Sequence, residues 1–308
     1  MRVEVKNLTR AFGRLRAVDD LSFSFGSGDI FGFVGPNGAG KTTTMRIIAT
    51  LDDPTEGDVL MDGVSVVQQP EQARRLVGFV PDTLPTHRDM TVHEYLDFYA
   101  RAYGLRGAQR VSVVDGIEEF CNLLGLRGKL MWAMSKGMRQ RLSVARALVH
   151  DPPVLVMDEP AAGLDPHARI ELRELVRVLA SRGKAVLISS HILTELAELC
   201  TGAVIIERGR LLRAGSLAQL DQVMVGRVLI IRCLADQEGL YRELLQTPGV
   251  LKAHIVDGTV QAQVEGQETD AARILAMLVG KGHQVVEFRQ RKAHLEDIFM
   301  SVTKGKVQ

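Results

Sequence analysis

Three short segments of the chain are almost entirely apolar: Ile30–Val34, Val154–Met157 and Ala185–Ser189. Segments this apolar are typical of strands in a parallel sheet that is covered on both faces. Each is followed by a glycine-rich or polar loop and then by a segment with helical periodicity. We therefore predict an α/β fold with a mainly parallel sheet, whose ligands bind at the carboxyl ends of these strands.

The loop after the first apolar strand matches the phosphate-binding pattern G-x-x-x-x-G-K-[ST]. It reads Gly35-Pro36-Asn37-Gly38-Ala39-Gly40-Lys41-Thr42-Thr43. Glycines let backbone N–H groups approach phosphate oxygens, and the helix that begins near Lys41 points its positive end at the same anion. We expect Lys41 to reach the β- and γ-phosphates and the Thr42 hydroxyl to ligate Mg²⁺. A chance glycine turn is the competing interpretation, but the position between strand and helix favours an ATP and Mg²⁺ site.

Polar residues also follow the other two apolar strands. Asp158 and Glu159 come directly after Val154–Met157, where Asp158 can hold Mg²⁺ through water and Glu159 can act as a general base on the attacking water. Without the phosphate loop, a solvated Asp-Glu pair would be the simpler interpretation. His191 follows Ala185–Ser189 and is either a hydrogen-bonded loop histidine or a γ-phosphate contact.

Length and charge limit the possible classes. The chain has 308 residues, which favours about two domains. Its formal net charge is +1, from 38 basic and 37 acidic residues, so it lacks the positive field that nucleic-acid binding usually needs. We expect no nucleic-acid partner.

The N-terminus and the cysteines indicate the compartment. Met1–Lys6 alternates charged and apolar residues, which predicts an edge strand rather than a signal peptide. No apolar run approaches the roughly 18 residues of a membrane helix. Cys121, Cys200 and Cys233 have no paired spacing, so we expect reduced, mostly buried thiols in a cytoplasmic protein, and neither a disulfide framework nor a zinc site.

The pattern changes twice along the chain. Residues 83–150 lack a buried strand and predict a helical subdomain, with helices at His93–Tyr103, Val114–Leu124 and Lys136–Val149. From Gly226 the predicted order is β-α-β-β-α-β, that of a ferredoxin-like α+β domain. Its strands are Val228–Arg232, Val250–Ile255, Thr259–Val264 and Gln284–Phe288, its helices are Glu238–Gln246 and Thr269–Leu278, and Asp257-Gly258 joins the middle strands. We place the domains at 1–220 and 226–308.

The ordered motifs resemble those of the nucleotide-binding subunits of ABC (ATP-binding cassette) transporters. Gly35–Thr43 resembles the Walker A loop, and the strand that ends at Asp158 resembles Walker B. Ala161–Asp165 resembles the D-loop and His191 the switch histidine. Met134–Arg141, at the start of a helix, resembles the signature Leu-Ser-Gly-Gly-Gln. The resemblance covers roughly residues 1 to 220 and implies the fold of a P-loop NTPase cassette with ATPase activity.

The signature segment can bind an anion for a physical reason. Ser135 and the Gly137 amide lie at a helix N-terminus, where anions bind readily. The resemblance implies that Ser135, Gly137 and Asp165 contact ATP held by an opposite subunit, in a homodimer or heterodimer of cassettes. Ser135 is also an ordinary N-cap candidate, and the two roles are compatible.

Four further positions show how closely the chain follows the family pattern. Lys136 and Met138 replace the Gly and Gln of the common signature, a variant that resembles exporters whose permease is a separate chain. Asp82 occupies the place of the Q-loop glutamine, where it either contacts Mg²⁺ through water or is a surface turn residue. Phe12 matches the position of the adenine-stacking aromatic ring, and its alternative role is a core residue at a strand end.

This resemblance implies a working partner. An exporter cassette without a membrane segment needs a transmembrane permease, with Thr83–Tyr99 nearest the docking groove, and would be peripheral on the inner face of the cell membrane. Leu295–Phe299 resembles a tail motif of this branch and otherwise packs as an amphipathic helix within His294–Val302. We predict a regulatory or dimer-stabilising C-terminal domain, and a solvated turn at Arg289–Lys292. The alternatives are an ABC protein acting on ribosomes or nucleic acid and a regulatory ATP sensor.

Overall fold

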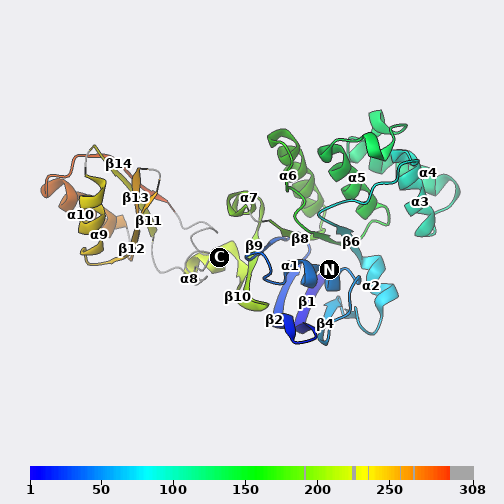
Figure 1. Ribbon diagram of the computed structural model, residues 1–308, viewed down its shortest axis with the longest axis horizontal. Coiled ribbons are helices and arrows are strands. Elements are labelled where there is room, and N and C mark those ends of the chain that lie inside the picture. The colour runs from blue at the N-terminus through cyan, green and yellow to red at the C-terminus, as the bar shows by residue number, and fades with distance from the viewer. Residues whose placement is uncertain (191, 224–226, 235, 257, 266–267, 292–308) are drawn as a thin grey trace. The chain divides into compact units, whose positions relative to one another are not determined.

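The computed structural model describes residues 1–190, 192–223, 227–234, 236–256, 258–265 and 268–291. The chain divides into two compact units, Met1–Ser216 and Leu217–Gln308 (Figure 1). The strands of the first unit are β1 (Arg2–Phe12), β2 (Leu15–Gly26), β3 (Ile30–Val34), β4 (Glu56–Met61), β5 (Val64–Ser65), β6 (Val77–Val80), β7 (Val154–Met157), β8 (Ala185–Ser189), β9 (Gly202–Glu207) and β10 (Arg210–Ser216). Its helices are α1 (Lys41–Ile48), α2 (Pro70–Leu76), α3 (Val92–Ala102), α4 (Gly107–Phe120), α5 (Lys136–Leu148), α6 (Pro166–Ser181) and α7 (Leu193–Leu199), with single turns η1 (Leu124–Leu126) and η2 (Met131–Ala133). The second unit contains α8 (Leu217–Val223), β11 (Arg227–Cys233), α9 (Gln237–Leu245), β12 (Val250–Val256), β13 (Thr259–Val264), α10 (Glu268–Gly280) and β14 (Val285–Arg291).

A six-stranded sheet organises the first unit. Its order is β10-β9-β3-β8-β7-β6, and all neighbours are parallel except β10 and β9. The three apolar segments that predicted buried strands are β3, β8 and β7, which are adjacent at the centre, and every residue in them is buried. The predicted mainly parallel sheet is confirmed.

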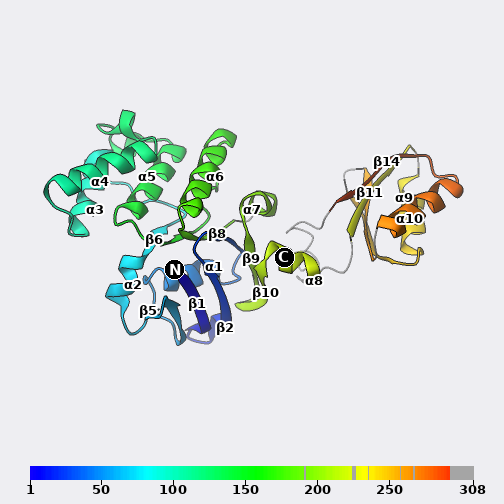
Figure 2. The same ribbon diagram turned by 180° about the vertical axis from the view of Figure 1, so that it is seen from behind.

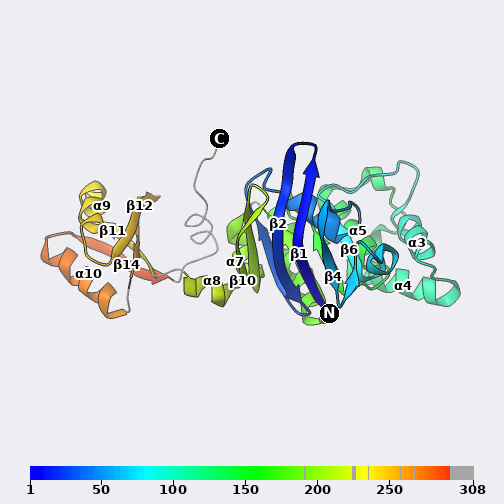
Figure 3. The ribbon, with the colours of Figure 1, turned by 90° about the horizontal axis from the view of Figure 1, so that it is seen from below.

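A second, antiparallel sheet was not predicted as a unit. Its order is β2-β1-β4-β5, so β1 is an interior strand and the predicted edge strand at Met1–Lys6 is wrong (Figure 3). The alternation has another cause, because Val3 and Val5 point into the core while Arg2 and Lys6 point to solvent. An interior antiparallel strand with one solvated face shows the same pattern as an edge strand.

The two sheets share one core with α1 between them. Buried side chains of β1, β2 and β4 pack with Met45, Ile47 and Ile48 of α1 and with one face of β3, β7, β8 and β9. Figures 1 and 2 show α5, α6 and α7 on the opposite side of the six-stranded sheet. The sheet is therefore covered on both faces, and its polar strand ends become the places where ligands can enter.

The helical subdomain contains α3, α4 and α5. The predicted bounds of α3 and α5 are right to within a residue, but the helix predicted at Val114–Leu124 begins at Gly107 and ends at Phe120. The early turns escaped prediction because their two valines are not buried: Val111 is half exposed and Val113 is partly exposed, so no buried periodicity appears. The helix ends early because Asn122 adopts a left-handed φ of 53°.

The second unit has the predicted β-α-β-β-α-β order. Its sheet, β12-β13-β11-β14, is antiparallel throughout, which is the ferredoxin-like arrangement. Helices α9 and α10 bury Leu240, Leu244, Ile274 and Leu278 against one face. The turn predicted at Arg289–Lys292 is wrong as far as Arg291, because β14 continues to that residue and pairs with β11. Asp257, Lys292, the helix predicted at His294–Val302 and the Leu295–Phe299 motif lie outside the described residues.

Among the described residues, no helix is long and apolar enough to cross a membrane. The three cysteines are buried, free thiols. Burial raises the pKa of Cys121 and of Cys200 to about 12, so both are neutral at physiological pH.

Candidate functional site

The phosphate loop connects β3 to α1. Two of its glycines have left-handed backbone angles, with φ of 78° at Gly38 and 99° at Gly40, which suit glycine. A Cβ at Gly35 would lie 2.5 Å from the carbonyl oxygen of Ile206, and one at Gly40 would lie 2.4 Å from that of Ala17. The loop is therefore packed so closely against β9 and β2 that side chains at these glycines would displace it.

Lys41 is the first residue of α1 and is buried. Its Nζ donates to the carbonyl oxygens of Gly35 at 2.7 Å and Pro36 at 3.2 Å, so the ammonium lies across the loop. Burial lowers the pKa of Lys41, while the carboxylates of Glu159 and Asp158 act in the opposite direction. The ammonium and these two carboxylates thus belong to one electrostatic cluster.

Asp158 and Glu159 follow β7, as predicted. Asp158 is buried, and its backbone N–H donates to the carbonyl oxygen of Val80 at 2.8 Å. Its Oδ1 accepts the hydroxyl proton of Ser189 at 2.7 Å, and that hydroxyl oxygen accepts the Glu159 N–H at 2.8 Å. Glu159 has a left-handed φ of 48°, a strained conformation of a kind that clusters at functional sites.

Adjacent parallel strands bring these residues together. In the order β3-β8-β7-β6, the carboxyl ends lead to the phosphate loop, Ser189, Asp158 and Asp82 respectively. Asp82 is exposed and lies one strand beyond Asp158. His191 lies outside the described residues.

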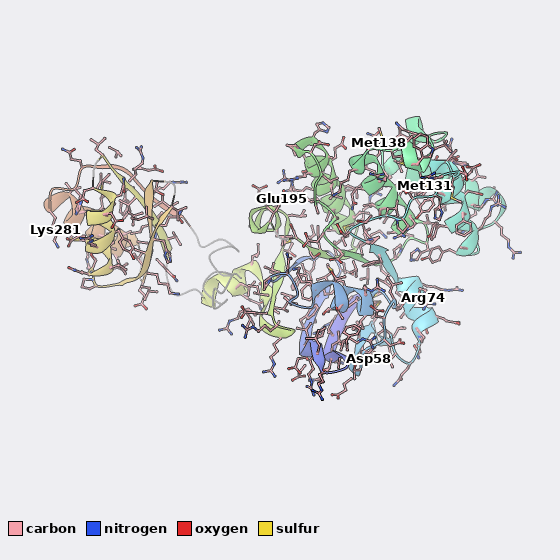
Figure 4. All side chains as sticks on the ribbon, viewed as in Figure 1. Asp58, Arg74, Met131, Met138, Glu195 and Lys281 are labelled. Atoms are coloured by element: carbon pink, nitrogen blue, oxygen red, sulfur yellow. The ribbon has the colours of Figure 1, made fainter. Side chains whose placement is uncertain are left out.

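The signature segment and the D-loop adjoin each other in the same chain. Ser135 caps α5 by accepting the Met138 N–H at 3.3 Å, and Asp165 caps α6 by accepting the Ala168 N–H at 2.9 Å. Met138 is labelled in Figure 4. A Cβ at Gly137 would lie 3.2 Å from that of Ala168. The Ala168 N–H also lowers the pKa of Asp165. Within the described residues, no hydrogen bond joins this pair of caps to the phosphate loop of the same chain.

Phe12 ends β1, and its ring is 50% exposed. The alternative that it is a core residue is therefore wrong. The guanidinium of Arg10 lies over the ring, 4.7 Å from its centroid. An exposed aromatic face is available for stacking, although adenine contact itself stays a prediction.

The residues present fit a magnesium ion. Mg²⁺ prefers oxygen ligands, and the predicted donors are the Thr42 hydroxyl and the Asp158 carboxylate. Thr42 is exposed at the start of α1. Oδ1 of Asp158 is engaged by Ser189, whereas Oδ2 has no hydrogen-bond partner among the described residues. One carboxylate oxygen is thus left for a cation or its water shell.

Comparisons with known proteins agree with this geometry. Residues 18–162 match the ABC transporter family, and residues 215–303 match the C-terminal domain of DrrA1-3-like ATP-binding proteins. A Nod factor export ATP-binding protein I from Cupriavidus metallidurans is 35% identical over 98% of this chain and 97% of that protein. Its counterpart from Mesorhizobium japonicum is 33% identical over 98% of this chain and 86% of that protein.

Solved structures extend the likeness to the fold. An ATP-binding subunit of an ABC transporter superposes with a TM-score of 0.66 at 30% identity, over 72% of this chain and 93% of that one. A dimeric ATP-binding cassette in a post-hydrolysis state with ADP and Pi superposes with a TM-score of 0.63 at 25% identity, over 70% and 98%. The chain belongs to the ATP-binding cassette family of ABC transporters. It is an ATP-binding, ATP-hydrolysing subunit, as the motifs predicted.

Sequence reasoning missed Ser189 as a member of the site. Its hydroxyl contacts both carboxylate-bearing residues, yet a serine at the end of an apolar strand carries no motif. Only the structure shows that β7 and β8 are adjacent, which places Ser189 beside the buried Asp158 carboxylate. A buried carboxylate needs hydrogen-bond partners.

Proposed function

We propose that this chain uses ATP hydrolysis to drive export through a separate transmembrane permease. The observation that carries the proposal is the convergence of the Gly35–Thr43 loop with Asp158 and Glu159 at the carboxyl ends of β3 and β7, on either side of β8. The names of the similar proteins, Nod factor export ATP-binding proteins, support export as the direction. We assign the choice of cargo to the permease.

The site residues divide between binding ATP and Mg²⁺ and activating the attacking water. Lys41 and the loop amides hold the β- and γ-phosphates, and Thr42 and Asp158 hold Mg²⁺, with Asp82 as a further water-mediated contact. Glu159 takes a proton from the attacking water, with His191 beside the γ-phosphate. Phe12 stacks on adenine. The ion, when bound, neutralises charge on the phosphates.

The site is completed by a second cassette. Ser135 and Gly137 lie at the start of α5, where N–H groups and the helix dipole attract anions, and Asp165 is the N-cap of α6. They make no hydrogen bond to the phosphate loop of their own chain among the described residues, which supports contact with ATP on an opposite subunit. We propose a dimer, either of this chain or with a related cassette.

The permease would dock on the helical subdomain. Large apolar side chains are exposed there, including Phe98 on α3 at 55% and Trp132 in η2 at 60%. Exposed aromatic side chains are common in protein interfaces. Docking around Thr83–Tyr99 would hold the chain at the inner face of the membrane.

The test of the catalytic assignment is Glu159→Gln. We expect wild-type ATP affinity with turnover lower by about 10²–10⁴-fold, because the base is lost while the fold of the loop is kept. Fluorescent-nucleotide binding and phosphate release measure the two quantities. Near wild-type turnover would remove Glu159 from its role.

The test of the transport assignment is co-purification. The chain, expressed with its neighbouring reading frames, should be recovered from membranes with a multi-span protein, and Trp132→Glu should weaken that association. Recovery without any membrane protein, together with normal ATPase activity, would favour the regulatory alternative.

A further inference from the structure

Ser189 occupies a central place in the site. It is the last residue of β8 and is completely buried. Parallel pairing sets Met157 opposite Ile188, so the following residues of the two strands, Asp158 and Ser189, emerge side by side. The register of two apolar strands therefore delivers a hydroxyl to a buried carboxylate.

The hydrogen bonds of this hydroxyl have a defined direction. Ser189 has one hydroxyl proton, and the Glu159 N–H occupies the oxygen as acceptor at 2.8 Å. The proton is directed to Oδ1 of Asp158 at 2.7 Å. Asp158 is held on its other side by the Val80 carbonyl oxygen, which accepts its N–H. The carboxylate thus has a fixed orientation, with Oδ2 as the oxygen left for a cation.

The same hydroxyl stabilises the conformation of Glu159. A left-handed backbone is unfavourable for this residue and persists only where neighbours hold it. Two hydrogen bonds do so: the Glu159 N–H to Ser189, and the Ala162 N–H to the Glu159 carbonyl oxygen at 3.0 Å. The direction of the Glu159 side chain depends on this backbone.

We propose that Ser189 is a positioning residue that couples the magnesium-binding and water-activating carboxylates through one hydroxyl. The proposal rests on the proposed function of Asp158 and Glu159. Through Ser189, β8 helps to fix the positions of the Asp158 and Glu159 carboxylates, which follow β7. Outer-shell partners of metal ligands act in this way, and their loss lowers metal affinity or activity by about 10–100-fold.

The test compares Ser189→Ala and Ser189→Cys with wild type in the full chain. Alanine removes the hydroxyl, and cysteine keeps the volume but is a weak donor. We expect both substitutions to raise the Mg²⁺ concentration needed for half-maximal binding of a fluorescent ATP analogue by about 10-fold or more. We expect them to lower kcat by a similar factor. Analogue binding in EDTA should stay at the wild-type value, because the phosphate loop is untouched.

Ser143→Ala is the matched control. Ser143 on α5 is also completely buried, and its hydroxyl has no hydrogen-bond partner in the described part of the chain, so its loss should leave Mg²⁺ dependence unchanged. Wild-type Mg²⁺ dependence and kcat in Ser189→Ala, or in Ser189→Cys alone, would overturn the inference. Hydrolysis by the wild-type chain that needs no Mg²⁺ would instead overturn the proposed function.

Discussion

The two units of the chain differ in what they bury. Every buried polar or charged residue in the described part of the chain belongs to the first unit, including Lys41, Asp158 and Ser189. The core of the second unit consists of apolar residues such as Leu229, Ile231 and Leu240. Burying a polar group is unfavourable unless it is hydrogen-bonded, so such groups mark where a fold is adapted to chemistry.

This difference places the chemically active side chains in the first unit. In the first unit, the left-handed Glu159 and the closely packed Gly35 and Gly40 adjoin the buried polar residues Lys41 and Asp158. The second unit is a packed sheet with two helices on one face. We therefore expect substitutions of the buried polar site residues in the first unit to change activity at nearly constant stability. Substitutions in the apolar core of the second unit should change stability at nearly constant activity.

The largest expected effect is that of Lys41→Met. The ammonium lies across the loop on the Gly35 and Pro36 carbonyl oxygens, and we expect it to turn to the phosphates when ATP binds. Its removal deletes that donor, so kcat should fall by about 10²–10³-fold. Steady-state phosphate release measures it. Lys184→Met is the control, because Lys184 Nζ also donates to a backbone carbonyl, that of Pro152 at 2.7 Å, but at the amino end of β8. Equal losses in the two variants would contradict the assignment.

An intermediate effect is expected from Leu240→Ala in the second unit. Leu240 on α9 is completely buried, and its truncation should lower the free energy of unfolding of that unit by about 2–5 kcal/mol. ATPase activity of the isolated chain should be unchanged. Calorimetry and phosphate release give the two numbers, with the 48% exposed Leu245 as the control position on the same helix. A matching loss of ATPase activity would contradict the expectation that the stability of the second unit and the activity of the first can change independently.

The smallest expected effect concerns pH and His150. Its ring stacks on Tyr103 with centroids 3.9 Å apart, and its Nε2 lies 3.1 Å from the Val77 carbonyl oxygen. Burial lowers the pKa of His150 below its usual 6.5, although the hydrogen bond to Val77 acts in the opposite direction. Between the lowered pKa and 6.5 the unfolded chain binds more protons, so the stability contributed by a neutral His150 is complete above 6.5 and is lost as pH falls.

The effect of His150 on stability should appear only in the unfolding transition of the first unit. His150→Gln should reduce the drop in Tm of that unit between about pH 7.5 and about pH 5.5, while the transition of the second unit keeps its own pH dependence. Calorimetric scans at both pH values measure the drop. An undiminished drop in the variant would assign the pH dependence to other groups.

Much of the fold and site followed from the sequence, for reasons the structure makes clear. Central parallel strands are buried on both faces, so their apolar runs predicted β3, β7 and β8 without ambiguity, and the residues after them fell at one edge of the sheet. The position of β1 could not be predicted, because edge and interior antiparallel strands share one alternation. Ser189 was missed because its role depends on the register between β7 and β8, which no local pattern records.

We propose that the nucleotide site becomes complete only between two cassettes. The most direct test is the mass in solution of the Glu159→Gln variant, measured by sedimentation with and without Mg²⁺-ATP. We predict a nucleotide-dependent shift from monomer to dimer that is lost on Ser135→Arg, because a large cation at the start of α5 obstructs the contact. A chain that binds Mg²⁺-ATP yet stays monomeric at saturating nucleotide and high protein concentration would contradict a composite site formed by two copies.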